Sequence, residues 1–139
     1  MPNSLAAAAI DAAAALKRTK DNLVLSYKET VYDVGESLVF FTPLKTGLAS
    51  SNWGVSNSGS KSLEREVKEG VKGKASLEAI SRAIPSLDFS KATIFNNPVD
   101  YIDDLERGTS PQARAGMVTP TKARINDLWL KNLRKNKII

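Results

Sequence analysis

Residues 24–43 read VLSYKETVYDVGESLVFFTP and carry the most regular pattern in the chain. Their apolar side chains recur every three or four residues, a spacing that places them on one face of an α-helix. This apolar stripe consists of Val24, Tyr27, Val31, Val34, Leu38 and Phe41. Thr42-Pro43 follows, and the residue before a proline is disfavoured in the helical conformation. The pattern therefore predicts a helix that ends at Phe41, with a weak point near Gly35.

The residues before this stripe extend the helix toward the N-terminus. Alanine runs at 6–9 and 12–15 favour helix, and Ser4 is a suitable cap. The apolar run is too short for a membrane span, and Asp11 interrupts it, so no membrane partner is expected. We expect one long helix within residues 1–41. At about 1.5 Å per residue it exceeds the width of a small domain, so part of it is expected to lie on a neighbouring subunit. The alternative for its second half is packing on the sheet of its own chain.

Composition limits the chemistry that is open to the chain. Its 139 residues include 20 Lys and Arg, 15 Asp and Glu, and neither His nor Cys. This length is typical of one domain with its own core, so we expect a single domain over 1–139. Without Cys and His there are no thiol nucleophiles or thiolate metal sites, and the commonest general base is missing. We expect no enzyme activity and no cofactor or metal.

Residues 42–118 are expected to form a small antiparallel sheet region. Short strands are predicted over Leu48–Asn57 and Phe89–Phe95 and at Met117–Val118, from their apolar and β-branched residues. Segment 57–75 is rich in Ser, Gly and Lys and is expected to be a long, mobile β-loop.

Helices are expected between and after these strands. Ser76–Ile84 predicts a short middle helix that Ser76 caps. Asn97-Pro98 opens a helical turn that Gly108 closes, and Thr119-Pro120 begins a C-terminal helix with a basic tail over 119–139. The order of elements indicates an α+β fold in which the C-terminal helix packs on the sheet.

Three further patterns suggest chemistry, but each fails on its context. Ser58–Lys61 and Lys45–Gly47 fit Ser-x-x-Lys and Lys-Thr-Gly, in the wrong order for a serine β-lactamase. Gly70–Ala75 lacks the first glycine and the hydroxyl residue of a phosphate-binding loop. An acidic cluster is more simply a solvated helix face or a partner for basic groups of a neighbouring subunit than a metal or hydrolytic site. It comprises Asp100, Asp103, Asp104 and Glu106.

The net charge of +5 is concentrated in two segments. Residues 43–75 carry six basic and three acidic side chains, and residues 119–139 carry six and one. Charged residues in exposed segments are candidates for an interface, or for non-specific contact with DNA phosphates. The candidate interface residues are Lys61, Arg65, Lys68, Lys72, Asp103, Arg107, Arg114, Arg134 and Lys135.

Two stretches together resemble a known family. Residues 42–53 read TPLKTGLASSNW, and residues 94–118 read IFNNPVDYIDDLERGTSPQARAGMV. They are similar to the motifs of head–tail joining and tail-completion proteins of tailed bacteriophages. In those motifs a segment leaves the long first helix for the sheet, and a strand ending in Asn precedes Leu-Glu-x-Gly and Gln-Ala-x-x-Gly-Met-Val elements. The matching residues are Thr42, Pro43, Thr46, Gly47, Trp53, Asn96, Tyr101, Leu105, Glu106, Gly108 and Gly116. The chain departs from the pattern at Val99-Asp100, which separates Pro98 from Tyr101, and at Arg114.

The resemblance implies a virion structural protein that forms a ring, expected to be a hexamer, at the neck or the top of the tail. Such a ring terminates the tail tube and joins it to the head connector. The implied partners are further copies of the chain, the head connector or adaptor, and the tail tube proteins. The implied location is the virion, with host cytoplasm during assembly. The alternative is a small DNA-binding protein that uses the basic loop and the C-terminal segment.

Overall fold

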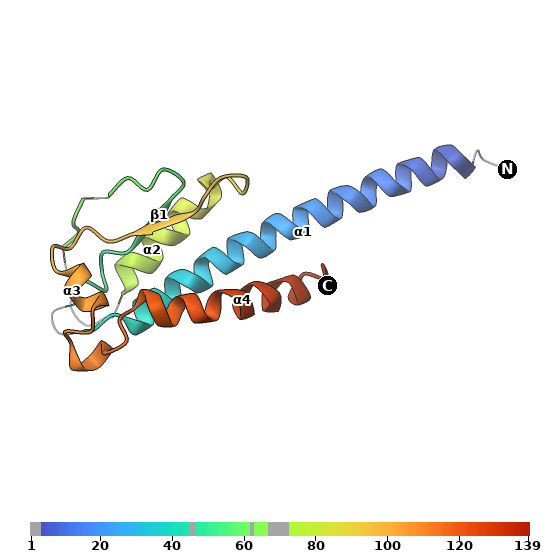
Figure 1. Ribbon diagram of the computed structural model, residues 1–139. Helices are drawn as coiled ribbons and strands as arrows, with labels where there is room; N and C mark the ends of the chain where they lie inside the picture. The colour runs from blue at the N-terminus through green and yellow to red at the C-terminus, as the bar shows by residue number, and fades with distance from the viewer. Residues whose placement is uncertain (1–3, 45–46, 62, 67–72) are drawn as a thin grey trace.

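The computed structural model describes residues 4–44, 47–61, 63–66 and 73–139, and shows a long helix that projects from a small body (Figure 1). The expected α+β class is confirmed, with a long N-terminal helix, a small antiparallel sheet, a short middle helix and a C-terminal helix. None of the described helices is both long and apolar enough to cross a membrane. The elements are α1 (Ser4–Phe41), β1 (Gly54–Ser56), α2 (Lys74–Ala83), the 3₁₀ turn η1 (Ile84–Ser86), β2 (Ile94–Asn96), α3 (Ile102–Glu106), the 3₁₀ turn η2 (Pro111–Ala113) and α4 (Val118–Lys135).

Helix α1 is continuous over 38 residues and ends at Phe41, as the apolar stripe predicts. Gly35 does not interrupt it. A Cβ at this position would lie 2.7 Å from Ile80 Cδ1, so glycine lets α2 approach α1 closely. At the C-terminal end, the Thr42 hydroxyl donates to the Leu38 carbonyl at 2.5 Å and closes the last turn.

The sheet is smaller than the sequence predicts. Strands β1 and β2 pair antiparallel over three residues each, with Val55 opposite Phe95. The expected strand over Leu48–Asn57 is wrong at its start, because residues 47–51 form a turn in which Ser51 N donates to Gly47 O at 3.0 Å. The expected strand over Phe89–Phe95 is likewise too long, since the Asp88 carboxylate accepts from the Ser90 amide at 2.9 Å and shapes a turn.

Two of the expected boundaries are corrected by hydrogen bonds made elsewhere. Ser76 does not cap α2, which begins at Lys74 after Gly73. The buried Ser76 hydroxyl instead donates to Ser50 O at 2.6 Å and accepts from Trp53 N at 2.8 Å. Met117–Val118 is not a strand, because Met117 precedes α4 and Val118 is its first residue.

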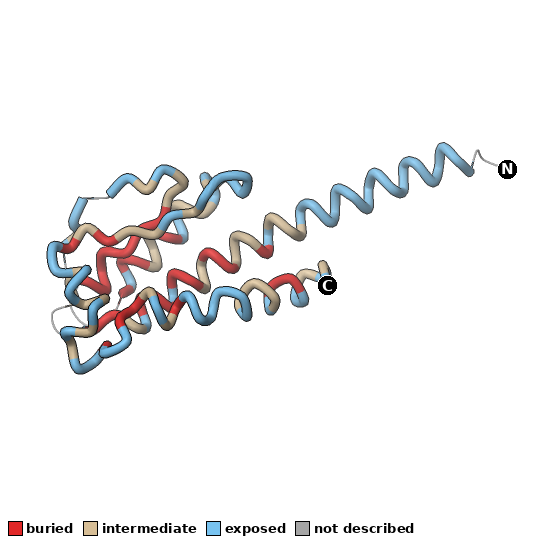
Figure 2. Tube along the Cα trace, viewed as in Figure 1, coloured by how far each residue is buried: buried red, intermediate tan, exposed pale blue. Residues whose placement is uncertain are grey.

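The core lies between the second half of α1, α2 and β1 (Figure 2). Burying a side chain such as Leu38 or Ile80 stabilises the fold by roughly 1.5–3 kcal/mol. Ile80 and Met117 have no exposed area. The cluster consists of Val31, Val34, Leu38, Val39, Trp53, Val55, Ile80 and Met117.

Helix α4 packs along α1 rather than mainly on the sheet, which corrects the expected neighbour (Figure 1). Their contact includes buried polar groups that are hydrogen-bonded to one another. Asn132 Nδ2 donates to Thr30 Oγ1 and to Asp33 Oδ2, both at 2.9 Å, and Ser26 Oγ donates to Asn132 O at 3.3 Å. Nearer the body, Ser37 and Thr121 hydroxyls lie 3.0 Å apart. Because these buried groups are mutually satisfied, they fix the register of the two helices.

Candidate assembly surfaces

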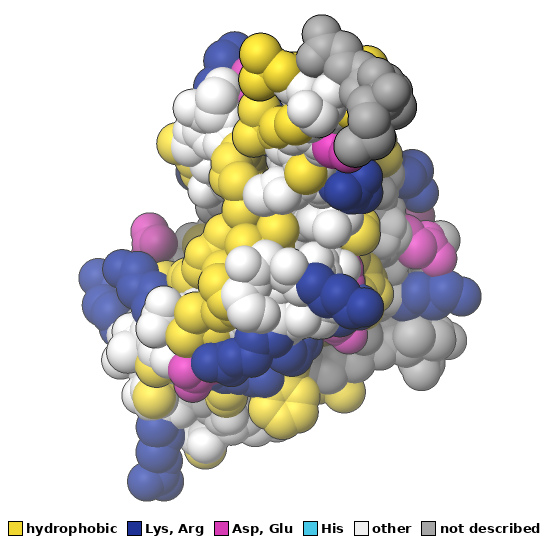
Figure 3. Space-filling view, turned by 90° about the vertical axis from the view of Figure 1, so that its right-hand side faces the viewer, with side chains coloured by type: hydrophobic (Ala, Val, Ile, Leu, Met, Phe, Trp, Pro, Cys, Tyr) yellow, Lys and Arg dark blue, Asp and Glu magenta, His cyan; other side chains and the backbone are white. Residues whose placement is uncertain are grey.

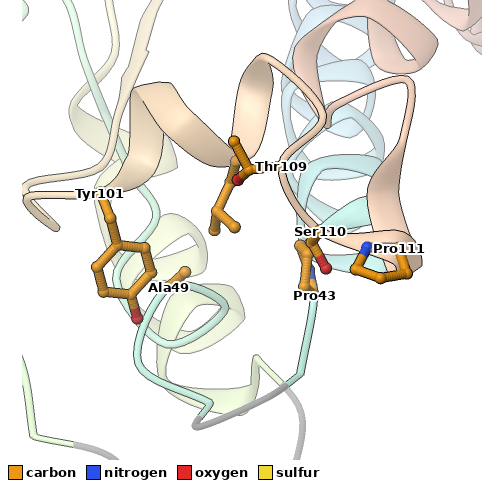
Figure 4. Close-up of a pocket in the computed structure, with 7 residues that line it drawn as sticks. Pro43, Ala49, Tyr101, Thr109, Ser110 and Pro111 are labelled. Carbon is orange, nitrogen blue, oxygen red and sulfur yellow. The ribbon is translucent and has the colours of Figure 1, made fainter.

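The two motif stretches, far apart in sequence, meet at a cleft of about 420 Å³ (Figure 4). Pro43 and Ala49 line it from the first stretch, and Tyr101, Leu105, Thr109, Ser110 and Pro111 from the second. Hydrogen bonds join its two sides, since Leu44 N donates to Gln112 Oε1 at 3.1 Å and Asn97 Nδ2 to Ala49 O at 2.8 Å. None of the described residues that line this cleft is charged. Its apolar character suits a segment of another protein better than it suits acid–base chemistry.

Trp53 connects the first stretch to the end of α1. Its indole Nε1 donates to Thr42 Oγ1 at 2.9 Å, and only 4% of its surface is exposed. Arg65 holds the same turn from outside, with Nε donating to Ser51 O at 2.9 Å and Nη2 to Trp53 O at 2.5 Å. The Asn52 amide accepts from Arg65 N and donates to Arg65 O. Arg65, which the sequence suggests for an interface, therefore has its guanidinium engaged within the chain.

Glu106 is the acidic group that the structure ties most closely to another element. Its carboxylate accepts from the amides of Met117 at 2.8 Å, Val118 at 2.7 Å and Thr119 at 3.1 Å. These amides begin α4, where the helix dipole also favours an anion. Burial raises the pKa of Glu106, but the hydrogen bonds from Val118, Met117 and Thr119 together outweigh it and lower the pKa below 4.5. Glu106 thus fastens α3 to the start of α4.

Gly116 makes this arrangement possible. Its φ of 78° is in the left-handed region that favours glycine. A Cβ there would lie 2.4 Å from the Glu106 carbonyl and 2.7 Å from its carboxylate. The Leu-Glu-x-Gly and Gly-Met-Val elements are therefore one structural unit, in which glycine leaves room for the carboxylate that caps the last helix.

The basic candidates are divided between the α1–α4 contact and the open surface. Lys135 pairs with Glu29, and Lys131 lies 3.1 Å from Asp33, so both join α4 to α1. The hydrogen bond from Lys135 lowers the pKa of Glu29. Arg107 pairs with Asp104 at 2.7 Å on the exposed face of α3. Lys61, Asp103, Arg114 and Arg134 are exposed, whereas Thr46 and residues 62 and 67–72 of the expected β-loop, which include Lys68 and Lys72, lie outside the described residues.

The described contacts do not bring the residues of the Ser-x-x-Lys, Lys-Thr-Gly and acidic patterns together in a catalytic arrangement. The Ser58 hydroxyl donates to Ser60 Oγ at 3.0 Å, while Lys45 and Thr46 lie outside the described residues. Within the described ranges, no group of three or more acidic side chains is placed to hold a metal ion. Two members of the acidic cluster, Asp104 and Glu106, are bound by groups of their own chain.

The first half of α1 is exposed to solvent along its whole length. Every residue from Ser4 to Asp21 is exposed, and Figure 2 shows this segment extending beyond the body. Leu5, Ile10 and Leu16 expose 78%, 69% and 63% of their surface. We call residues 4–23 the arm. Most helical stability in proteins comes from packing of one face, so the arm, whose residues to Asp21 are all exposed, gains stability from contact with another molecule.

Beside the base of the arm lies an apolar groove of about 590 Å³ between α1, α4, the segment before β2 and β2 itself. Phe89 and Ile125 line it and expose 43% and 41% of their surface. We call this the α1–α4 groove. Its lining residues are Tyr27, Thr30, Val31, Val34, Phe89, Thr93, Phe95, Lys122, Ile125, Asn126 and Trp129. The sequence predicts a last helix packed on the sheet, and this groove was not predicted from it. One signal in the sequence could have indicated the groove. The last helix carries more apolar side chains than a small sheet can cover.

Comparisons of the chain with protein-family models, with curated proteins and with solved structures find no match.

Proposed function

We propose that the chain is a structural protein of a tailed-bacteriophage virion, which assembles as a ring at the neck or the top of the tail. In this role it completes the tail and joins it to the head connector, and its partners are further copies of itself and the adjacent connector and tube proteins. The proposal that this assembly is a phage neck or tail ring rests on the resemblance of residues 42–53 and 94–118 to neck and tail-completion proteins.

The observation that carries an assembly role is the arm. It presents three large apolar side chains to water on a helix whose residues to Asp21 are all exposed. Leu5 and Leu16 lie on one face of this helix with Ala9 and Ala12 between them. Monomeric soluble proteins rarely expose large contiguous apolar patches, and such patches mark interaction surfaces. A ring of identical subunits also needs two different complementary surfaces on each copy, and the arm and the α1–α4 groove are two such surfaces.

The described contacts give less support to the alternative of DNA binding. Lys131 and Lys135, which the sequence offers to phosphate, are paired with Asp33 and Glu29 of α1. Phosphate binding at these positions would compete with the existing ion pairs.

The test is to measure the mass of the purified full-length chain by mass photometry and to image it by negative stain. The measurement is made alone and with the proteins encoded beside its gene. We expect closed rings, or a monomer that enters rings when the connector or tube protein is added. A chain that stays monomeric and binds none of these proteins contradicts the proposal. A parallel titration with duplex DNA at low salt tests the alternative, which requires affinity that falls steeply as salt rises.

A further inference from the structure

We propose that the arm of one copy docks in the α1–α4 groove of the next copy, and that this contact links neighbouring subunits of the assembly. The inference rests on the proposed function for its ring. It specifies which two surfaces meet.

The arm has one uncharged face. Positions that alternate by four and three residues lie along one side of a helix, and in the arm all of them lack charge. The charged residues of the arm lie at other positions of the helix and are Asp11, Lys17, Arg18, Lys20 and Asp21. The uncharged positions are Leu5, Ala9, Ala12, Leu16, Thr19 and Leu23.

This face lies in line with the surface on which α1 packs against α4. The same alternation leads on to Ser26, Thr30, Asp33 and Ser37, each of which hydrogen-bonds to a residue of α4. Helix α4 ends at Lys135, beside Glu29, so α1 extends past it with the packing face uncovered. Figure 3, which views the molecule from the side where α1 projects, shows a band of hydrophobic side chains with Lys and Arg on both sides.

The groove and the arm differ in a complementary way. Aromatic side chains of Tyr27, Phe89 and Trp129 line the groove, whereas Ala9 and Ala12 leave the middle of the arm face shallow. A helix with small side chains can lie close over large ones, with a leucine at either end as an anchor, as in helix-in-groove recognition. A single contact then covers both apolar surfaces, while pairing two arms with each other leaves the groove open.

The arm cannot fill the groove of its own chain. Tyr27, Val31 and Val34 line the groove from the same continuous helix to which the arm belongs. Residues 4–34 include no glycine or proline that would favour a sharp reversal. The occupant is therefore a second copy, and a contact between two different surfaces repeats from copy to copy, as closure of a ring requires.

The test compares two matched pairs of substitutions in the full-length chain. Ala9→Glu with Ala12→Glu places two carboxylates on the proposed contact face, and Ala7→Glu with Ala14→Glu places them on the opposite face of the same helix. Both pairs add the same charge through the same exchange of alanine for glutamate. We expect the first pair to weaken self-association at least about tenfold, and the second by less than about twofold, because only the first buries unpaired charge. Equal behaviour of the two pairs overturns the proposal.

Because the chain has no cysteine, a disulfide identifies the surfaces directly. A chain with Ala12→Cys is mixed with a chain with Ile125→Cys and oxidised; Ala14→Cys with Ile125→Cys is the control. We expect a covalent dimer of two different chains only in the first mixture. If the Ala12→Cys chains instead form disulfides mainly with one another, the arms pair with each other and the proposal is overturned. Rings that form without the arm-to-groove disulfide overturn this contact and leave the proposed function standing, whereas a chain that forms no assembly contradicts both.

Discussion

The two halves of α1 belong to one uninterrupted helix but obey different physical requirements. Residues 24–41 carry an apolar stripe that packs into the core, and Val31, Val34 and Leu38 expose 7% or less of their surface. Residues 4–21 are exposed throughout and depend on alanine to remain helical. The difference teaches that one half of the helix serves folding of the chain, while the other is available for contacts outside it.

One substitution in each half tests this difference directly, and the largest expected change in the free energy of unfolding comes from the core half. Leu38→Ala creates a cavity in the core and is expected to lower the free energy of unfolding by about 2–5 kcal/mol. Leu16→Ala is expected to change it by less than about 0.5 kcal/mol, because Leu16 is 63% exposed. Urea denaturation of dilute protein measures both values. Similar losses for the two variants would contradict the separation of the halves.

A second prediction concerns the carboxylate that holds the start of α4 in the folded half. Glu106→Gln is expected to lower the free energy of unfolding by about 1.5–3 kcal/mol, because it removes charge-assisted hydrogen bonds to helix amides. Asp103→Asn, on the exposed face of the same short helix, is the control and is expected to have little effect. Urea denaturation at pH 7 measures both.

The same variant makes a prediction about pH. The pKa of Glu106 is lower in the folded chain than its ordinary value of 4.5, so its contribution is complete above pH 4.5. The contribution is lost as pH falls through the lower pKa of the folded chain. The stability difference between the parent chain and Glu106→Gln should therefore shrink as the solution is acidified. A difference that is constant from pH 7 to pH 3 would show that the carboxylate charge has no part in it.

A third prediction tests the polar contact at which α4 ends its coverage of α1. Asn132→Ala leaves Thr30 and Asp33 without their amide partner and is expected to lower the free energy of unfolding by about 1–2 kcal/mol. Asn126→Ala makes the same change at an exposed position of α4 and serves as the control. Urea denaturation distinguishes them, and equal effects would mean that the buried hydrogen bonds add nothing.

The smallest expected effect is at the ion pair between Glu29 of α1 and Lys135 of α4. Lys135→Gln removes the hydrogen bond that lowers the pKa of Glu29, so this pKa is expected to rise toward 4.5. An NMR titration of the Glu29 carboxyl carbon measures it. Lys137→Gln, a similar change two residues later, should leave the Glu29 pKa unchanged; the same rise in both variants would refute the specific pair.

Features that follow from regular spacing of apolar residues were predicted correctly. Features that depend on which hydrogen bonds a segment makes were predicted poorly. The limits of α1 followed from its stripe and from Thr42-Pro43, because helical spacing is a property of the sequence alone. The strands over 48–57 and 89–95 were predicted too long, since turn hydrogen bonds by Ser51 and Ser90 replace pairing there. Ser76 was assigned to a cap because its partners, Ser50 and Trp53, are distant in sequence.

The candidate surfaces were predicted in part. Because α1 is longer than a small domain is wide, the sequence predicted that part of it lies on a neighbouring subunit. That contact stays a prediction. Glu106 was grouped with its acidic neighbours, because no pattern in the sequence reveals that its carboxylate meets the amides of Met117 and Val118. The α1–α4 groove depends on the angle and register of two helices, which the polar pairs at Thr30 and Asn132 determine.

Hydrogen–deuterium exchange along α1 tests the central claim, that the arm is the assembly segment, most directly. In dilute protein, amides of residues 9–20 should exchange rapidly while those of 26–41 are protected. When the chain assembles, at high concentration or with its partner, exchange of residues 9–20 should slow by at least about tenfold. Assemblies in which residues 9–20 exchange as fast as in the dilute chain would contradict the claim.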